Sequence, residues 1–374
     1  MALYKSLVNK VPIPADKKTK QKEYETTGCL AIVDQGKKLI GGYTNNLDML
    51  LKCTLPVIVF GDHTCAVKYV NFPFGAGADG IKVLSPKEGV LPKYLFYGTQ
   101  YLTLRFPDKG YARHYQHIEK MDIPLPPLEE QHRIVTRIEE LFSELDKGVE
   151  TLQTIQQQLA VYRQAVLKEA FASLHDKIAI RNISSMVTSG SRGWAKYYNE
   201  SGARFIRITD LTRDHIKLKN DSIQRVLLPE DAEGKRSHLQ GNDVLVSITA
   251  DLGSIALIPD GIEESYINQH IAVVRFSDAS QGKFMAWYLK SEYGQKDLLR
   301  NKRGGGKLGL GLDDIRNTPV PVVNNELANG IVAEIESRLS VCDSIEQTVD
   351  TALSQAEAMR QSVLKKAFEG GFSE

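Results

Sequence analysis

The chain has 374 residues, of which 42% are hydrophobic and 25% are charged. This length predicts at least two domains, and this composition is typical of a soluble globular protein rather than a disordered or fibrous one. No apolar run is long enough to span a bilayer, and Met1 to Pro12 lacks the apolar core of a signal peptide, so we expect a cytoplasmic protein.

The net charge of +1 hides an uneven distribution of charge along the chain. Residues 1–122 hold 17 Lys and Arg against 11 Asp and Glu, and residues 175–317 hold 21 against 18. Residues 123–174 and 318–374 are acidic, with 5 against 8 and 4 against 9. Basic globular parts joined by acidic segments favour a protein whose domains bind a polyanion, although merely solvated helices would have the same composition.

Residues 1–122 predict a mixed α and β domain, with short strands at Gly28–Val33 and Leu55–Phe60. A lysine cluster before the strands suits contacts with phosphates, and a solvated loop is an equally good interpretation. Tyr111–His117 holds two Tyr, two His and an Arg, which favours contacts with bases over metal binding, because no acidic residue or cysteine accompanies the histidines. The candidate DNA-binding residues of this domain are Lys17, Lys18, Lys20, Lys22, Tyr43, Arg113, His114, Tyr115 and His117.

The sequence contains one long internal repeat. Ile134–Phe171 and Ile331–Phe368 share 16 identities over 38 residues without a gap, at an offset of 197. Each copy follows a proline-rich segment, and because proline lacks a backbone donor, that segment ends the preceding structure and leads into a helix. The offset is too long for a solenoid repeat and predicts two copies of a module made of a globular part and a long helix.

Both copies predict long helices, the first from about Leu128 to Leu174. Apolar residues recur at alternating steps of four and three, which is typical of a heptad seam. Small residues of the second helix face large ones of the first, so we expect the helices to pack, and connectivity favours an antiparallel pair. Such a helix, roughly 45 residues and about 70 Å long, would hold two domains a fixed distance apart. The predicted packing residues are Ile138, Leu141, Leu145, Leu152, Ile155, Leu159, Ile335, Cys342, Ile345, Val349 and Met359.

Residues 175–317 predict a second mixed α and β domain with a helix at Phe284–Leu299. Apolar runs bounded by turn residues indicate its strands. The expected strands are Arg204–Thr209, Asp243–Ile248 and Ile271–Phe276.

Two loops of this domain suit contacts with a DNA backbone, residues 188–194 and 301–307. The second is not a phosphate-binding loop of the nucleotide type, because Leu308 follows Lys307 where Ser or Thr is needed. The candidate DNA-binding residues of this domain are Ser189, Ser191, Arg192, Arg207, Arg213, Lys302, Arg303 and Lys307.

Other chemistry is weakly indicated. Asp221 followed by Glu233-Gly-Lys235 is faintly similar to a metal-dependent nuclease motif, but Glu-x-Lys is common by chance. The four cysteines have neither metal-binding nor disulfide spacing. We therefore expect no metal site, no cofactor and no catalytic residue.

Several motifs resemble the specificity subunit of type I DNA restriction-modification enzymes. They are the segment PLPPLEEQ at Pro124–Gln131, the closing motif Gln164–Phe171 with its second copy, and Tyr266–Ile271. The resemblance covers the whole chain in order, and PLPPLEEQ is its most specific part. The chain departs from the family pattern at Lys5–Asp34, which lacks the Gly-rich opening found at Thr188–Trp194.

The resemblance implies an α+β fold with a pseudo-two-fold internal repeat. It implies target recognition domains at residues 1–122 and 175–317, separated by conserved spacer helices at residues 123–174 and 318–374 that pack as an antiparallel coiled coil. Each recognition domain would read one half of a split site in double-stranded DNA. The helices would set the spacing and bind two methylation subunits, restriction subunits would join the full complex, and the chain itself would have no catalytic site.

We expect each domain to enter the major groove of one half-site, with the half-sites about one helical turn, or ~34 Å, apart. The site should be asymmetric because the two domains differ in sequence. Two other functions stay open: a stand-alone magnesium-dependent DNA nuclease, and a coiled-coil scaffold that does not bind DNA.

Overall fold

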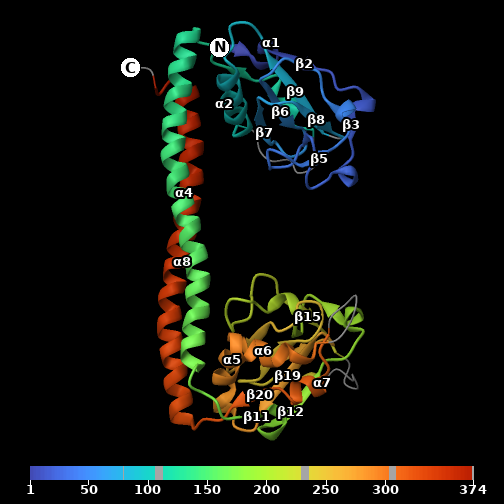
Figure 1. Ribbon diagram of the computed structural model, residues 1–374, viewed down its shortest axis with the longest axis vertical. Coiled ribbons are helices and arrows are strands. Elements are labelled where there is room, and N and C mark those ends of the chain that lie inside the picture. The colour runs from blue at the N-terminus through green and yellow to red at the C-terminus, as the bar shows by residue number, and fades with distance from the viewer. Residues whose placement is uncertain (79, 106–112, 229–235, 303–308, 373–374) are drawn as a thin grey trace. The chain divides into compact units, whose positions relative to one another are not determined.

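The computed structural model describes residues 1–78, 80–105, 113–228, 236–302 and 309–372 (Figure 1). Contacts divide the chain into a first unit, residues 1–152 with 350–374, and a second unit, residues 153–349. Each unit joins a globular α and β part to portions of two long helices around its own buried core, which confirms the predicted α+β class. In the part of the chain that the structure describes, no helix is both long and apolar enough to cross a membrane.

The described residues of the first globular part form two four-stranded sheets and a short terminal pair. The first sheet has the order β2 (Val8–Val11), β9 (Ile81–Pro86), β6 (Val57–Gly61), β7 (Val67–Val70). The second has the order β3 (Lys18–Thr19), β8 (Phe74–Gly77), β4 (Leu30–Val33), β5 (Gly42–Thr44). β1 (Ala2–Leu3) pairs with β10 (Asp122–Ile123), and the helices are α1 (Tyr4–Leu7), α2 (Pro92–Thr103) and α3 (Tyr115–Ile118).

The globular part of the second unit has the same kinds of sheet. One has the order β12 (Ser184–Ser189), β19 (Ile271–Phe276), β16 (Val244–Ser247), β17 (Ile255–Leu257). The other has the order β13 (Tyr198–Asn199), β15 (Gln224–Val226), β14 (Ala203–Ile206), β18 (Ser265–Ile267). β11 (Lys177–Ala179) pairs with β20 (Pro319–Pro321), and the helices are α5 (Gly282–Lys290), α6 (Glu292–Leu298) and α7 (Leu312–Arg316).

The first sheets of the two units are built alike. In the first unit, β6 lies between its hairpin partner β7 and the long strand β9. In the second unit, β16 lies in the same way between β17 and β19. β6 and β16 are buried at every position, as expected for continuous apolar runs in the centre of a sheet. The strands predicted at residues 28–33, 55–60, 204–209, 243–248 and 271–276 are confirmed within two or three residues at their ends.

The single helix predicted at Phe284–Leu299 is wrong, because Ser291 divides it into α5 and α6. Ser291 has an extended backbone (φ −64°, ψ 161°), and its side chain accepts a hydrogen bond from the Gly294 amide. A serine in this role caps the start of a new helix.

Two helices of 44 residues each contribute to both units, α4 (Leu128–Phe171) and α8 (Asn325–Phe368). α4 begins at the predicted residue and ends three residues early, because the chain turns at 172–174, where the Leu174 amide donates to the Phe171 carbonyl. In the second unit, Arg163 of α4 pairs with Asp343 of α8, and Glu169 of α4 pairs with Arg338 of α8. Residue numbers rise along α4 as they fall along α8, so the helices are antiparallel (Figure 1).

An arginine and an aspartate repeated in both helices pair with each other across the helix interface. In the second unit, Arg163 contacts Asp343 at 2.7 Å and Glu346 at 2.8 Å, and its side chain is 9% exposed. In the first unit, Arg360 pairs with Asp146 and lies over the Phe142 ring. These pairs have the same register, because one is the image of the other under the 197-residue repeat.

The predicted packing residues divide into three groups. Buried side chains are those of Ile138, Leu159, Ile335, Cys342 and Val349. Partly buried side chains are those of Leu141, Leu145, Leu152 and Ile155. Ile345 and Met359 are corrections, since they are 39% and 55% exposed. A straight helix drifts relative to a strict heptad, so residues on a 3.5-residue repeat leave the interface where the helices do not supercoil enough.

A lysine is buried in the second unit. Lys290, at the end of α5, is 6% exposed and donates to the carbonyls of Thr212 and His215. Burial lowers the pKa of Lys290 to about 7, a shift that the nearby Asp214 carboxylate opposes.

We predict that Arg163→Ala lowers the free energy of unfolding of the second unit by about 1–2 kcal/mol, because the guanidinium is buried while its carboxylate partners remain half-exposed. Arg360→Ala is the matched control from the repeat. Its side chain is 28% exposed, so its loss should cost less than about 1 kcal/mol. Urea unfolding of both variants measures this, and equal losses would contradict it.

We predict that stability rises with pH because of Lys290. The unfolded lysine keeps its proton up to about pH 10, whereas the folded one loses it near 7, so between these values the unfolded chain binds more protons. The free energy of unfolding should gain about 2 kcal/mol from pH 7 to about pH 9. Lys290→Met should lack this gain, and parallel pH profiles for the two proteins would disprove it.

Candidate nucleic-acid interface

An open, polar pocket of about 750 Å³ lies where several loops of the second unit meet. The register of the sheet brings them together: the end of β12, Ser189, pairs with Ala272, and the end of β16, Ser247, pairs with Ile271. The loops that leave β12 and β16 therefore meet the loop that enters β19. The lining residues are Ser189, Gly190, Ser191, Arg192, Arg236, Thr249, Gln269 and His270.

The loop after β12 is held at two points. A Cβ on Gly190 would lie 1.9 Å from the Ile267 carbonyl oxygen, so only glycine permits this close approach to the β18 end. Farther along, the Trp194 indole donates to the Ser191 carbonyl at 2.8 Å, and its ring packs 4.7 Å from that of Phe205. Arg192 is exposed between these anchors.

Three side chains of the pocket form one hydrogen-bonded chain. Gln269 Nε2 lies 2.8 Å from His270 Nε2, and His270 Nδ1 lies 2.6 Å from Thr249 Oγ1. An amide nitrogen can only donate, so His270 Nε2 accepts and Nδ1 donates to Thr249. The Thr249 hydroxyl then has its own hydrogen to donate toward the pocket.

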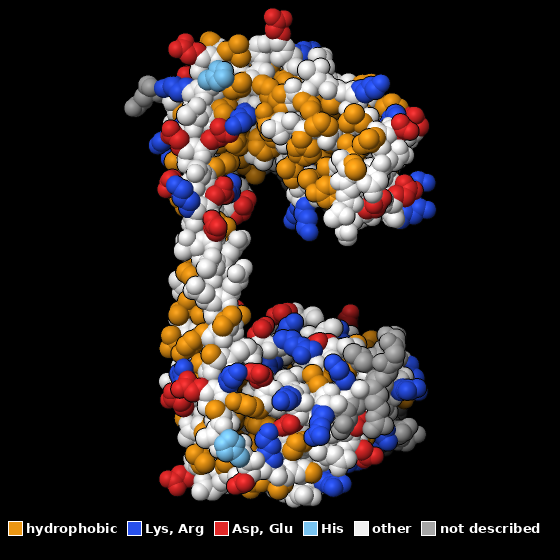
Figure 2. Space-filling model, viewed as in Figure 1, with side chains coloured by type: hydrophobic (Ala, Val, Ile, Leu, Met, Phe, Trp, Pro, Cys, Tyr) orange, Lys and Arg blue, Asp and Glu red, His pale blue; other side chains and the backbone are white. Residues whose placement is uncertain are grey.

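The chemistry of the pocket suits binding. Arg192 and Arg236 are exposed cations on its rim, and hydroxyl, amide and imidazole groups line it. Among the described residues, no group of three or more His, Cys, Asp or Glu is arranged to hold a metal ion. Guanidinium groups beside neutral donors and acceptors are suited to phosphates and base edges. Lys and Arg side chains are spread over the visible face of the second unit (Figure 2).

The structure brings together only some of the residues predicted in the second unit. Ser189, Ser191 and Arg192 line the pocket. Arg207 instead donates to Asp210 and Ser222, and Arg213 donates to Asp251. Lys302 is exposed after the 3₁₀ turn Leu299–Asn301, while Arg303 and Lys307 lie outside the described residues, as do Glu233 to Lys235.

In the first unit, four of the nine predicted residues are exposed. Lys18, Lys20, Lys22 and Arg113 are exposed. The Lys17 ammonium donates to the Asp48 carbonyl, Tyr43 is half-buried in β5, and His117 is half-buried in α3. Tyr111 and Ala112, the start of the aromatic and basic stretch, lie outside the described residues.

The prediction that His114 and Tyr115 contact DNA is wrong, since they are 1% and 3% exposed. Asp62 holds this segment inside the unit: its carbonyl accepts from the His114 amide at 2.8 Å, and its carboxylate accepts from the Tyr115 amide at 2.9 Å. The Tyr115 ring packs 5.9 Å from that of Phe60 in the core. Burial raises the pKa of the Tyr115 hydroxyl.

Four pocket residues lie outside the predicted loop at residues 188–194 and were not predicted. Gln269 and His270 fall within the motif Tyr266–Ile271, which marked the segment but not its role. Arg236 and Thr249 carry no signal in the sequence: the register of β16 brings Thr249 to the pocket, and Arg236 reaches it from a 3₁₀ turn outside the sheet.

Known proteins share this organisation. A family model described as the type I restriction modification DNA specificity domain matches residues 14–159 and 195–355. The EcoBI specificity subunit of Escherichia coli is 26% identical over 281 residues, which cover 66% of this chain and 58% of that subunit. The EcoKI specificity subunit of E. coli strain K12 is 26% identical over 271 residues, 67% of this chain and 57% of that subunit. The chain thus matches less than two thirds of the length of these relatives.

A solved chain from work on complex assembly and conformational transition of the type I R-M system has the same fold. Its TM-score is 0.68 at 18% identity, covering 98% of this chain and 96% of that one. The fold likeness therefore extends beyond the stretch in which the curated relatives match. Because the family model matches most of the chain in two successive segments, the chain belongs to the type I restriction modification DNA specificity family.

Proposed function

We propose that the chain is the non-catalytic subunit of a type I restriction-modification complex that recognises a two-part, asymmetric site in double-stranded DNA. The observation that carries this proposal is the polar pocket of the second unit, with two exposed arginines beside a hydrogen-bonded Gln269–His270–Thr249 chain. A pocket of this kind offers charge to a phosphate backbone and directional donors and acceptors to base edges.

In this proposal the two kinds of group have different roles. Arg192 and Arg236 contact phosphates, which supplies affinity that does not depend on sequence. Ser191, Thr249 and Gln269 face base edges or sugars, which supplies register and discrimination. His270 bonds to Thr249 through Nδ1 and to Gln269 through Nε2, so its ring fixes the orientation of the Gln269 amide.

The globular part of the first unit would read the other half-site. It has the same order in its first sheet, but Asp62, His63 and Thr64 follow β6 where Ile248, Thr249 and Ala250 follow β16. Thr64 donates to the Gln35 carbonyl, whereas Thr249 accepts from His270. Different loops on a shared sheet support an asymmetric site, with Lys18, Lys20, Lys22 and Arg113 as proposed phosphate contacts.

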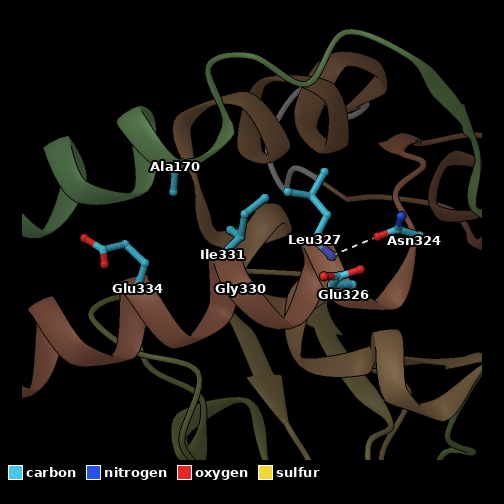
Figure 3. Close-up of a pocket in the computed structure, with 7 residues that line it drawn as sticks. All are labelled: Ala170, Asn324, Glu326, Leu327, Gly330, Ile331 and Glu334. Carbon is cyan, nitrogen blue, oxygen red and sulfur yellow. Dashed lines mark hydrogen bonds between the residues drawn. The ribbon is translucent and has the colours of Figure 1, made fainter.

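The helices would set the gap between half-sites and bind the methylation subunits. A second pocket, of about 480 Å³, supports such docking and is formed by α8 with Ala170 of α4 (Figure 3). Leu327 and Ile331 line it with apolar surface, and Leu327 is 48% exposed. Glu326 and Glu334 lie at its rim, so the surface fits a partner segment that carries apolar and basic side chains.

The internal repeat shows what sets this groove apart. Where α8 has Leu327 and Gly330, α4 has Glu130 and Arg133, which pair with each other at 2.8 Å. A Cβ on Gly330 would meet nothing within 4 Å, so packing inside the chain does not require glycine there. Glycine within a helix costs up to about 1 kcal/mol relative to alanine, and close approach of a partner would account for it.

We predict that Arg192→Ala and Arg236→Ala each weaken binding of the full chain to short duplex DNA. Each should also reduce the slope of log K against log salt by about 1, because one phosphate contact is lost. Arg181→Ala is the control, because Arg181 is exposed on the same unit outside the pocket. Salt titrations by fluorescence anisotropy measure the slopes, and unchanged slopes in both variants would contradict the assignment.

We predict that Gly330→Ala raises the free energy of unfolding by about 0.5–1 kcal/mol, whereas Gly330→Arg abolishes co-purification with the methylation subunit. Gly148 is the matched control, since it too is helical and has nothing within 4 Å of a built Cβ. Gly148→Arg should keep the partner. Equal co-purification of the two arginine variants would exclude the groove as a docking site.

A further inference from the structure

The turn between β16 and β17 has a backbone that needs outside support. It carries Thr249 into the pocket, and the next residue, Ala250, has a φ of 57°. Non-glycine residues disfavour this left-handed region because Cβ crowds the backbone. Gly253, with a φ of 80°, completes the turn.

Side chains from three directions hold this turn. From within it, Ser254 Oγ donates to Asp251 Oδ2 at 2.7 Å. From α6, Gln295 Nε2 donates to the Gly253 carbonyl at 2.8 Å. From the loop before β15, Arg213 donates through Nε to Asp251 Oδ1 at 3.1 Å and through Nη2 to the Leu252 carbonyl at 2.6 Å.

The loop that carries Arg213 is itself anchored by Lys290. The ammonium donates to the Thr212 carbonyl and, at 2.9 Å, to the His215 carbonyl, so it holds the backbone on both sides of Arg213. The Thr212 hydroxyl donates to the His215 carbonyl at 2.9 Å and tightens the same loop. A continuous path of hydrogen bonds thus leads from α5 to the turn of Thr249.

We propose that Lys290 and Arg213 are positioning residues of the second recognition domain, an inference that rests on the proposed function. Lys290 holds the Thr212–His215 loop, and Arg213 fixes the turn that presents Thr249 to DNA. Arg213 then acts inside the protein and not as a phosphate contact. Two of its nitrogens are engaged with Asp251 and Leu252, and the carboxylate of Asp251 balances its charge.

The shifted pKa values agree with this geometry. Hydrogen bonding to Arg213 and then to Ser254 lowers the pKa of Asp251, so the ion pair persists through the neutral range. Burial lowers the pKa of His215, which leaves its Nδ1 able to accept from the Lys217 amide at 3.0 Å.

The two roles for Arg213 predict opposite effects of changing its partner. If Arg213 is a brace, Asp251→Asn loosens the turn and weakens DNA binding. If Arg213 contacts phosphate, Asp251→Asn removes a competing carboxylate and strengthens binding. Both side chains are about half-exposed, at 51% and 54%, so neither change disturbs a core.

The test uses the full chain and the duplex that the wild-type chain selects from a random-sequence library. Arg213→Ala and Asp251→Asn should each raise the dissociation constant roughly tenfold, the effect of losing one charged hydrogen bond, and the double variant should be no weaker than either single one. The salt slope should stay unchanged in all three. Arg213→Lys, which keeps one donor for Asp251, should recover part of the affinity.

Hydrogen exchange tests Lys290 without DNA. In Lys290→Met the amides of residues 213–216 and 250–254 should exchange faster, while those of the first unit should not change. If that variant does not fold, the DNA-binding measurements on the surface variants of Arg213 and Asp251 test the inference. A lower salt slope for Arg213→Ala, or tighter binding by Asp251→Asn, overturns the inference alone. A wild-type chain that selects no duplex overturns the proposed function and the inference with it.

Discussion

The register of the two long helices, marked by the pairs Arg163–Asp343 and Arg360–Asp146, is the main constraint on the fold. Each helix contributes one half to each unit, so the register of the helices decides which side chains enter each core. In this register, Phe171 and Ile335 are buried in the second unit, and Ile138 and Phe368 in the first. The residues next to these in sequence are charged, as Arg137 and Glu139 are beside Ile138 and Glu334 and Glu336 are beside Ile335, so a one-residue change of register would bring charge into the cores.

Each globular part packs against the C-terminal end of one of the two long helices. Phe171 packs against Phe284 and Tyr288 of α5, and Phe368 packs against Tyr94 and Tyr101 of α2. The sheets lie behind these helices, and their strand register then brings distant loops into one pocket. The polar surface proposed to bind DNA thus rests on a sequence of packing relations that begins at the helix pair.

Periodicity and repetition made the helices and the main strands predictable. Long apolar runs such as those of β6 and β16 have one stable place in a sheet, and the identities at an offset of 197 require two similar modules. The failures have local causes. Ile345 and Met359 fit the heptad pattern of the sequence, but their side chains are exposed. His114 and Tyr115 are buried in a segment that hydrogen bonds to Asp62 hold in the core. The binding pocket was only partly predictable, because strand register brings Thr249 and His270 together and no local pattern places Arg236 beside them.

We propose above that one chain reads two different half-sites across a fixed gap. Mapping methylated adenines in DNA from cells that carry the chain with its methylation subunit tests it most directly. We expect a motif of two unequal parts separated by a constant number of unspecified base pairs. A continuous motif, a palindromic one, or no methylation above background would contradict it.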